Sequence, residues 1–167
     1  INLEIQKQDL IDKQVIDKFL KKEVVLIHGV TSSGKTEIYI KLIEETLSKG
    51  KQVLYLLPEI ALTAQIVNRL LVHFGSRTGV YHSKFSDNER VEIWNAVLNN
   101  LKNNNKPETL NFEVHYDLIL GARSALFLPF TNLGLVIIDE EHENTFKQTE
   151  PAPRYHARDA AIYLAGL

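Results

Sequence analysis

The segment that most constrains this chain is His-Gly-Val-Thr-Ser-Ser-Gly-Lys-Thr at 28–36, which follows the apolar run 24–27. It fits the pattern G-x-x-x-x-G-K-[ST], and an amphipathic pattern typical of a helix comes directly after it. Glycines at two positions let successive backbone N–H groups face an anion, and the helix that begins at Lys35 adds its positive dipole end. The segment therefore predicts a phosphate-binding loop between a strand over 24–27 and a helix.

The last two side chains of this loop suit a nucleotide with its metal ion. Lys35 is expected to contact the β- and γ-phosphates, and the Thr36 hydroxyl is expected to be a ligand of Mg²⁺, which prefers oxygen donors. A glycine-rich turn that binds nothing is the alternative interpretation. A second motif later in the chain favours the phosphate-binding role.

That second motif is Asp-Glu-Glu-His at 139–142, which follows the apolar run 135–138. An acid at the carboxyl end of a buried parallel strand lies in the crevice where open α/β sheets bind ligands. We expect Asp139 to hold Mg²⁺ through its water shell and Glu140 to polarise the water that attacks the γ-phosphorus. An acidic cluster alone indicates a solvated turn, but together with Lys35 it indicates an ATP site. His142 either links this site to another motif or caps a turn.

Apolar runs and helical periods alternate along the chain. Strands are expected at 53–57, 79–82, 117–121 and 135–139, and helices are expected over about 9–21 and from Lys35 to a last turn at 49–50. This alternation predicts a doubly wound, mainly parallel α/β sheet with helices on both faces. The polar, asparagine-rich segment 99–111 is expected to be an exposed, mobile insertion.

Two further helices are expected from apolar residues at helical spacing. The first has the predicted buried face Ile60, Ala64, Val67, Leu71 and Phe74, and it ends at Gly75. The second begins at a capping box formed by Ser86 and Glu89. Its predicted buried face is Val91, Trp94, Leu98 and Leu101, so we expect Trp94 to lie in the core.

Composition excludes several classes of protein. The chain has 167 residues, 44% apolar and 24% charged, which suits one soluble domain with a sizeable core. A net charge of −2 is not that of an overall basic nucleic-acid binder, although a local cationic groove is compatible with it. Without cysteines there are no disulfides or cysteine zinc sites. No leader or membrane-length apolar run is present, so we expect a cytoplasmic protein, and a start at Ile1 indicates a piece of a larger one.

Several longer stretches carry a family resemblance. The chain resembles, over nearly its whole length, the bacterial replication-restart helicases of the PriA type (primosomal protein N′), a branch of superfamily 2. The stretches are Gly-Val-Thr-Ser-Ser-Gly-Lys-Thr-Glu at 29–37, Leu-Pro-Glu-Ile-Ala-Leu-Thr at 57–63, His-Ser at 82–83, Gly-Ala-Arg-Ser-Ala-Leu-Phe at 121–127, Asp-Glu-Glu-His at 139–142 and Pro-Arg-Tyr-His-Ala-Arg-Asp at 153–159.

The resemblance implies that residues 1–167 are the ATP-binding domain, the first RecA-like lobe, of an ATP-dependent 3′-to-5′ DNA helicase that restarts stalled replication forks. The implied partners are single-stranded and forked DNA, a second motor lobe in the same protein, and, through the full-length protein, the primosome and single-strand-binding proteins, with no membrane. Because the second lobe would supply an arginine finger, the fragment alone is expected to hydrolyse almost no ATP.

The resemblance also assigns roles to individual residues. Gln6 is the implied adenine contact, with Gln8 as an alternative, and the nucleotide would further contact Gly29, Thr31, Ser32, Ser33, Gly34, Lys35, Thr36 and His142. The implied catalytic residues are Lys35, Asp139 and Glu140, with Thr36 and Asp139 on the metal. DNA would meet Glu59, Thr63, Arg123, Ser124, Phe146, Lys147, Tyr155 and His156.

Physical chemistry supports these DNA roles but leaves alternatives. Aromatic rings stack on unpaired bases at about 1–3 kcal/mol per base, and cationic side chains meet phosphates. Phe146 and Tyr155 could instead form a hydrophobic clasp that holds their loop, and Arg123 could pair with a nearby acid. For the whole chain, the alternatives are another superfamily 2 translocase acting on DNA or RNA, or a nucleotide-dependent docking module.

Overall fold

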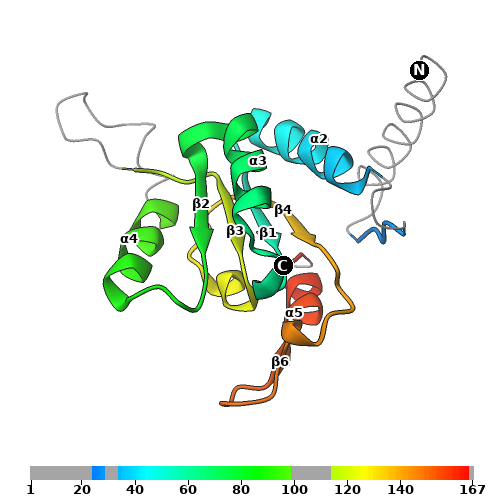
Figure 1. The fold of residues 1–167 in the computed structure, drawn as a ribbon, viewed down its shortest axis with the longest axis vertical. Helices are drawn as coiled ribbons and strands as arrows, with labels where there is room; N and C mark the ends of the chain where they lie inside the picture. Colours follow the sequence, from blue (N-terminus) through cyan, green and yellow to red (C-terminus); the bar gives the residue numbers. More distant parts are fainter. Residues whose placement is uncertain (1–23, 29–33, 99–113, 166–167) are drawn as a thin grey trace.

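The computed structural model describes residues 24–28, 34–98 and 114–165 (Figure 1). Short 3₁₀ helices carry the label η. In chain order the elements are α2 (Lys35–Ser48), β1 (Gln52–Leu56), η1 (Glu59–Ala61), α3 (Ala64–Phe74), η2 (Gly75–Arg77), β2 (Thr78–Tyr81), α4 (Asp87–Leu98), β3 (Leu118–Gly121), η4 (Arg123–Phe127), β4 (Leu133–Ile138), η5 (Asn144–Phe146), β5 (Lys147–Gln148), β6 (Tyr155–His156) and α5 (Ala157–Ala165).

Four parallel strands form the main sheet, in the order β2-β3-β1-β4 (Figure 1). Strand β1 lies between two neighbours, with Val53 opposite Leu118 of β3 and opposite Leu135 of β4. All five residues of β1 are buried. A strand buried on both faces reads as a continuous apolar run, and the expected parallel sheet is confirmed.

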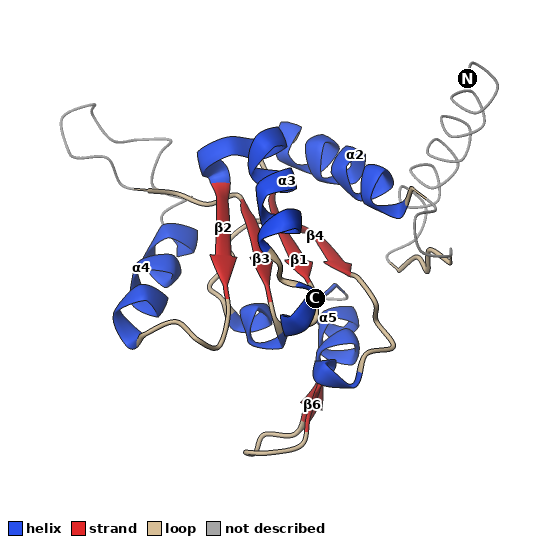
Figure 2. Ribbon diagram, viewed as in Figure 1, coloured by secondary structure: helices blue, strands red, loops and turns tan. Residues whose placement is uncertain are grey.

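Side chains that alternate along β1 enter two separate cores, because successive residues of a strand point to opposite faces. Val53 and Tyr55 join a cluster with buried residues of α2 and α3. Leu54 and Leu56 join a second cluster with residues of α4, η4 and α5. Helices therefore cover both faces of the sheet (Figure 2), as the doubly wound prediction required.

The predicted capping box at the start of α4 is present. The Ser86 backbone N–H donates to a Glu89 carboxylate oxygen at 2.8 Å, and the Glu89 N–H donates to the Ser86 hydroxyl at 3.4 Å. The Ser86 hydroxyl also donates to this carboxylate at 2.7 Å, and the bonds from the Ser86 hydroxyl and N–H hold the pKa of Glu89 below its usual value. The two residues satisfy each other's free N–H groups, so the helix begins where the sequence predicted.

The predicted core face of α4 is wrong. Trp94 is 46% exposed, and Val91 and Leu98 lie on the same exposed side. The residues that pack on the sheet are Ile93, Ala96 and Val97. Helix α4 carries two apolar rows, and periodicity alone does not show which row the sheet covers.

The helix expected from Ile60 is also different in the structure. Pro58 leads into the short η1, where Ile60 is exposed, and α3 begins only at Ala64. Its covered row is Ile66, Leu70 and Phe74, whereas the predicted Leu71 faces outward. This helix is apolar on several sides, so its rotation depends on contact with the sheet. Gly75 ends it, as predicted.

The strand expected at 24–27 is not formed. Residues 24–28 have no regular structure, and Leu26 is 76% exposed. A strand is stable only with a hydrogen-bonded neighbour, and in the described ranges β4 pairs with β1 alone. The expected helix over 9–21 and the asparagine-rich segment 99–111 lie outside the described residues.

One buried polar side chain joins the sheet to the surrounding loops. Gln52, at the start of β1, is fully buried. Its Nε2 donates to the Val97 carbonyl at 3.1 Å, and its Oε1 accepts from the Thr131 N–H at 2.9 Å and the Asn132 N–H at 3.1 Å. A buried amide of this kind stabilises the fold because all its partners would otherwise lack hydrogen bonds.

Replacing Gln52 with leucine should therefore lower the free energy of unfolding. The change keeps a buried side chain but leaves three backbone groups unpaired, which we expect to cost about 2–4 kcal/mol after relaxation. Urea unfolding would measure it. The control Gln65→Leu, on an exposed position of α3, should change stability by less than about 0.5 kcal/mol. Equal stability of the two variants would contradict the assignment.

Candidate functional site

The predicted site segments lie along one edge of the sheet. Glu59 follows β1, His82 follows β2, Arg123 follows β3, and Asp139 follows β4. Because all four strands are parallel, their carboxyl ends meet at the same edge. This edge is where open α/β sheets bind ligands.

The first turn of α2 carries the end of the predicted phosphate loop. Gly34 precedes the helix in a left-handed conformation, with φ 82° and ψ 9°, and its carbonyl accepts from the Glu37 N–H at 3.0 Å. Lys35 and Thr36 are the first two helical residues, and the N–H groups of a helix's first turn point toward the position where an anion binds. The expected contacts Gln6, Gly29, Thr31, Ser32 and Ser33 lie outside the described residues.

Asp139 continues the sheet by one residue beyond β4. Its N–H donates to the Leu56 carbonyl at 3.0 Å. One carboxylate oxygen, Oδ2, accepts from the Tyr55 hydroxyl at 3.0 Å, and the other, Oδ1, accepts from the Glu140 N–H at 3.1 Å. Backbone and side-chain hydrogen bonds together hold this carboxylate at the edge of the sheet.

A second tyrosine, on α2, lies near the same carboxylate. Burial raises the pKa of Tyr39 to about 12, and the nearby charge of Asp139 adds to the rise. The same causes, burial first, raise the pKa of Tyr55 well above its ordinary value. Both hydroxyls therefore stay protonated near neutral pH. The two rings pack edge to face, with centroids 5.6 Å apart.

The chain turns sharply after Asp139. Glu140 has φ 51°, a left-handed conformation that costs a residue with a side chain roughly 1–2 kcal/mol. Its carbonyl accepts from the Glu143 N–H at 2.9 Å, and its side chain is exposed. Strain of this kind is concentrated at functional sites. His142 is exposed in the same turn, with its Nε2 4.0 Å from a Glu143 carboxylate oxygen.

The donor set at this edge fits Mg²⁺ held with its waters. Asp139 and Thr36 offer oxygen ligands, which magnesium prefers. Within the described ranges, no three His, Cys, Asp or Glu side chains group together as a metal site. Magnesium usually binds through one or two protein groups together with substrate phosphates, so two protein oxygens suffice.

Arg123 connects the end of β3 to the segment that follows the acidic turn. Its Nη1 donates to the Thr145 carbonyl at 3.1 Å and to the Lys147 carbonyl at 2.8 Å. The guanidinium carbon lies 5.9 Å from the centre of the Tyr155 ring. A guanidinium has five N–H donors, so these contacts leave others for a ligand. The alternative expectation was an ion pair between Arg123 and a nearby acid. In the structure its hydrogen-bond partners are instead these two backbone carbonyls.

A glycine determines how Arg123 leaves the sheet. A Cβ at Gly121 would overlap the Ala125 methyl group in η4. Glycine therefore lets η4 fold back against the end of β3, which brings Arg123 over the next segment. Ser124 is exposed beside it.

The predicted aromatic loop is only partly available for stacking. Phe146 is 1% exposed and packs in the second core, so its burial favours the clasp over base stacking. Tyr155 is half-buried, edge to face with Phe127 at 5.0 Å. Lys147 is exposed opposite His156, where strands β5 and β6 pair antiparallel.

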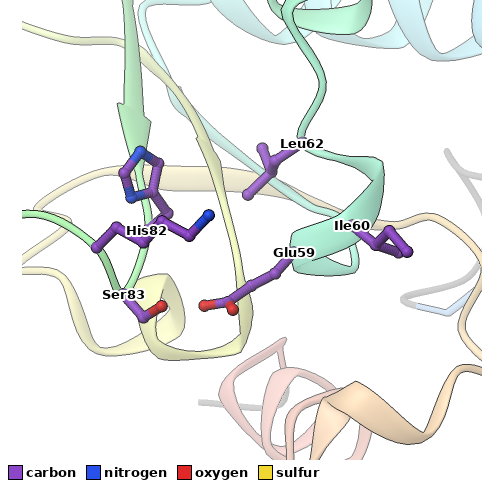
Figure 3. Close-up of a pocket in the computed structure, with 6 residues that line it drawn as sticks. Glu59, Ile60, Leu62, His82 and Ser83 are labelled. Carbon is purple, nitrogen blue, oxygen red and sulfur yellow. The ribbon is translucent and has the colours of Figure 1, made fainter.

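The segment after β1 lines a shallow pocket (Figure 3). Glu59 and Thr63 are both exposed, and Thr63 is the N-cap residue of α3. Figure 3 shows the Glu59 carboxylate and the Ser83 hydroxyl pointing toward each other. The pocket measures about 270 Å³ and is lined by Glu59, Ile60, Leu62, His82, Ser83 and Lys84.

Sequence reasoning missed four side chains that support this edge. Tyr55 donates to Asp139, Tyr39 packs on Tyr55, Phe127 packs on Tyr155, and Arg158 donates to a Glu141 carboxylate oxygen at 2.9 Å. A signal existed for Tyr55, because a phenol inside a continuous apolar strand needs a buried acceptor.

Across the described ranges, no helix is long and apolar enough to span a membrane.

Known proteins resemble the chain closely. "Replication restart protein PriA" of Bacillus subtilis is 49% identical over 143 residues, which cover 86% of this chain and 16% of that protein. The proteins of the same name from Haemophilus influenzae and Synechocystis are 46% and 44% identical over similar spans. The chain spans about one sixth of the length of these relatives.

The family comparison covers most of the chain. The DEAD/DEAH box helicase family matches residues 9–161. The doubly wound parallel sheet agrees with the RecA-like fold that the resemblance implied. The chain belongs to the DEAD/DEAH box helicase family.

Proposed function

We propose that this chain is the ATP-binding first motor lobe of a cytoplasmic 3′-to-5′ DNA helicase that restarts stalled or collapsed replication forks. One observation carries the proposal. Asp139, at the end of β4, accepts a hydrogen bond from Tyr55 of β1, and Tyr55 packs against Tyr39 of α2, the helix that begins with Lys35 and Thr36. The names of the relatives, which are replication restart proteins, support the biological task.

The proposed chemistry divides ATP hydrolysis among four side chains. Lys35 contacts the β- and γ-phosphates, and Thr36 and Asp139 hold Mg²⁺, directly and through water. Bound magnesium neutralises charge on the phosphate oxygens. Glu140 orients the attacking water and accepts its proton. Gly29, Thr31, Ser32, Ser33 and Gly34 line the phosphates, Gln6 contacts adenine, and His142 links the nucleotide to the neighbouring segment.

The proposed DNA surface lies on the same edge of the sheet. Single-stranded DNA would contact Arg123 and Lys147 through phosphates and Tyr155 through stacking. Glu59, Thr63, Ser124 and His156 complete this surface. Phe146 is left out because it is buried.

The complete protein would supply the remaining parts. We propose a second lobe in the same chain, forked DNA as substrate, and primosome and single-strand-binding proteins as partners. Since an arginine finger contributes about 10³–10⁵ in rate, this lobe alone should turn over almost no ATP.

The first test is ATP turnover by the complete protein with and without forked DNA. We expect strong stimulation by DNA, and Lys35→Ala should abolish turnover because the phosphates lose their cation. The control Lys49→Ala, at the other end of α2, loses only an exposed ion pair with Glu45 and should retain turnover. DNA-independent turnover would favour a docking module, and preference for RNA would favour another superfamily 2 translocase.

Glu140→Gln should separate ATP binding from hydrolysis. Without a carboxylate to accept the proton, the rate should fall by about 10²–10⁴, while ATP still binds. Single-turnover hydrolysis and nucleotide binding would be measured on the same preparation. Glu92→Gln, at an exposed position of α4, serves as the control. Hydrolysis at the parental rate would exclude Glu140 as the group that orients water.

Arg123→Gln tests the charge of Arg123 separately from its contacts. A glutamine amide can still donate to a carbonyl, but it cannot neutralise a phosphate. The plot of log affinity for single-stranded DNA against log salt should become shallower by about 0.7. Arg123→Ala should weaken binding further, whereas Lys49→Gln, at the opposite sheet edge, should leave the slope unchanged. A parental slope in both Arg123 variants would place Arg123 away from DNA.

A further inference from the structure

The Asp139 carboxylate is held by one side chain and one backbone group. Its Oδ2 accepts from the Tyr55 hydroxyl of β1 at 3.0 Å, and its Oδ1 accepts from the Glu140 N–H at 3.1 Å. Tyr39 of α2 packs edge to face on the Tyr55 ring. Rotation of the carboxylate about its terminal bond would break these contacts, so its oxygens have defined directions.

Both tyrosines are rigid supports. Tyr55 is fully buried between two neighbouring strands, and Tyr39 is buried in the same cluster. Their rings pack edge to face at an angle of 73°. Phenylalanine would fill the same apolar space, so packing alone does not explain a buried hydroxyl group that donates to a carboxylate.

We propose that Tyr39 and Tyr55 are positioning residues that aim the Asp139 carboxylate at the water shell of a magnesium–nucleotide complex. This inference rests on the proposed function of the site. A carboxylate has about four lone-pair positions, so the hydrogen bonds from the protein leave at least one for metal-bound water. A carboxylate that binds the metal ion directly is oriented by that bond. A carboxylate that contacts only metal-bound water has no such bond, so the protein must fix its orientation.

The position of Tyr39 in the helix adds a second consequence. Tyr39 follows Lys35 by four residues, so both side chains lie on the same face of α2. Because Tyr39 packs on Tyr55, which donates to Asp139, it connects the helix that begins at the phosphate loop to the acid that faces the metal. The tyrosine pair aligns the cationic and the metal-binding halves of one site.

The experiment measures magnesium dependence of nucleotide binding to the complete protein. ADP with a fluorophore on its ribose is titrated with Mg²⁺, and binding without Mg²⁺ is measured separately. The variants are Tyr55→Phe, Tyr39→Phe and the double variant. Tyr116→Phe, which packs against the other core, is the matched control. Thermal unfolding of each variant reports any loss of stability.

We expect each single variant to raise the Mg²⁺ concentration at half-maximal ADP binding, the midpoint, about three- to tenfold. The double variant should raise it further. In sites where the side chain binds the metal directly, partners that orient it typically contribute 10- to 100-fold to metal affinity. Binding without Mg²⁺ should stay unchanged. A purely structural role would lower the melting temperature and leave the midpoint unchanged.

The outcomes separate this inference from the proposed function. If the parent protein binds ADP with a Mg²⁺ dependence and the folded Phe variants have the parental midpoint, the positioning role is overturned and the ATP site remains. If the parent shows no Mg²⁺-dependent binding, both proposals fall. Should Tyr55→Phe fail to fold, Tyr39→Phe alone decides, because Tyr39 lies in a helix and is 6% exposed, whereas Tyr55 is fully buried in the central strand.

Discussion

The hydrogen-bonded position of β1 between β3 and β4 is the constraint on which the rest of the structure depends. Both edges of β1 are paired, and both faces are buried. The strand therefore has no freedom to shift along its neighbours without moving side chains between the two cores. Asp139 follows β4 and Arg123 follows β3, and both strands are paired with β1. The positions of the two residues relative to each other therefore depend on the register of these three strands.

Strands and turns were predictable because their signals are local. Continuous apolar runs marked β1, β3 and β4, and the Ser86 box marked the start of α4. Helix rotation was not predictable, since α3 and α4 each have two apolar rows and only contact with the sheet selects one. The run at 24–27 has the composition of a strand, but strand formation depends on a partner that composition does not specify.

The candidate site divides in the same way. The motifs at Lys35 and Asp139 could be located from spacing, because phosphate and metal chemistry require those residue types in that order. Their supports could not, since Tyr39 and Tyr55 are far apart from Asp139 in sequence and look like ordinary core residues. Phe146 shows the converse, because an aromatic residue in a polar loop reads as a ligand contact although it lies in the core.

The two carbonyl contacts of Arg123 have a thermodynamic consequence. The guanidinium is shared between the proposed DNA surface and the backbone at Thr145 and Lys147, a few residues beyond Glu140. A ligand that drew Arg123 away would remove these two contacts from the segment next to the proposed nucleotide site. Coupling between binding sites is reciprocal, so any change that DNA makes in nucleotide affinity is matched by an equal change that nucleotide makes in DNA affinity. In the proposed helicase, this reciprocity would make the affinity for DNA differ between nucleotide states.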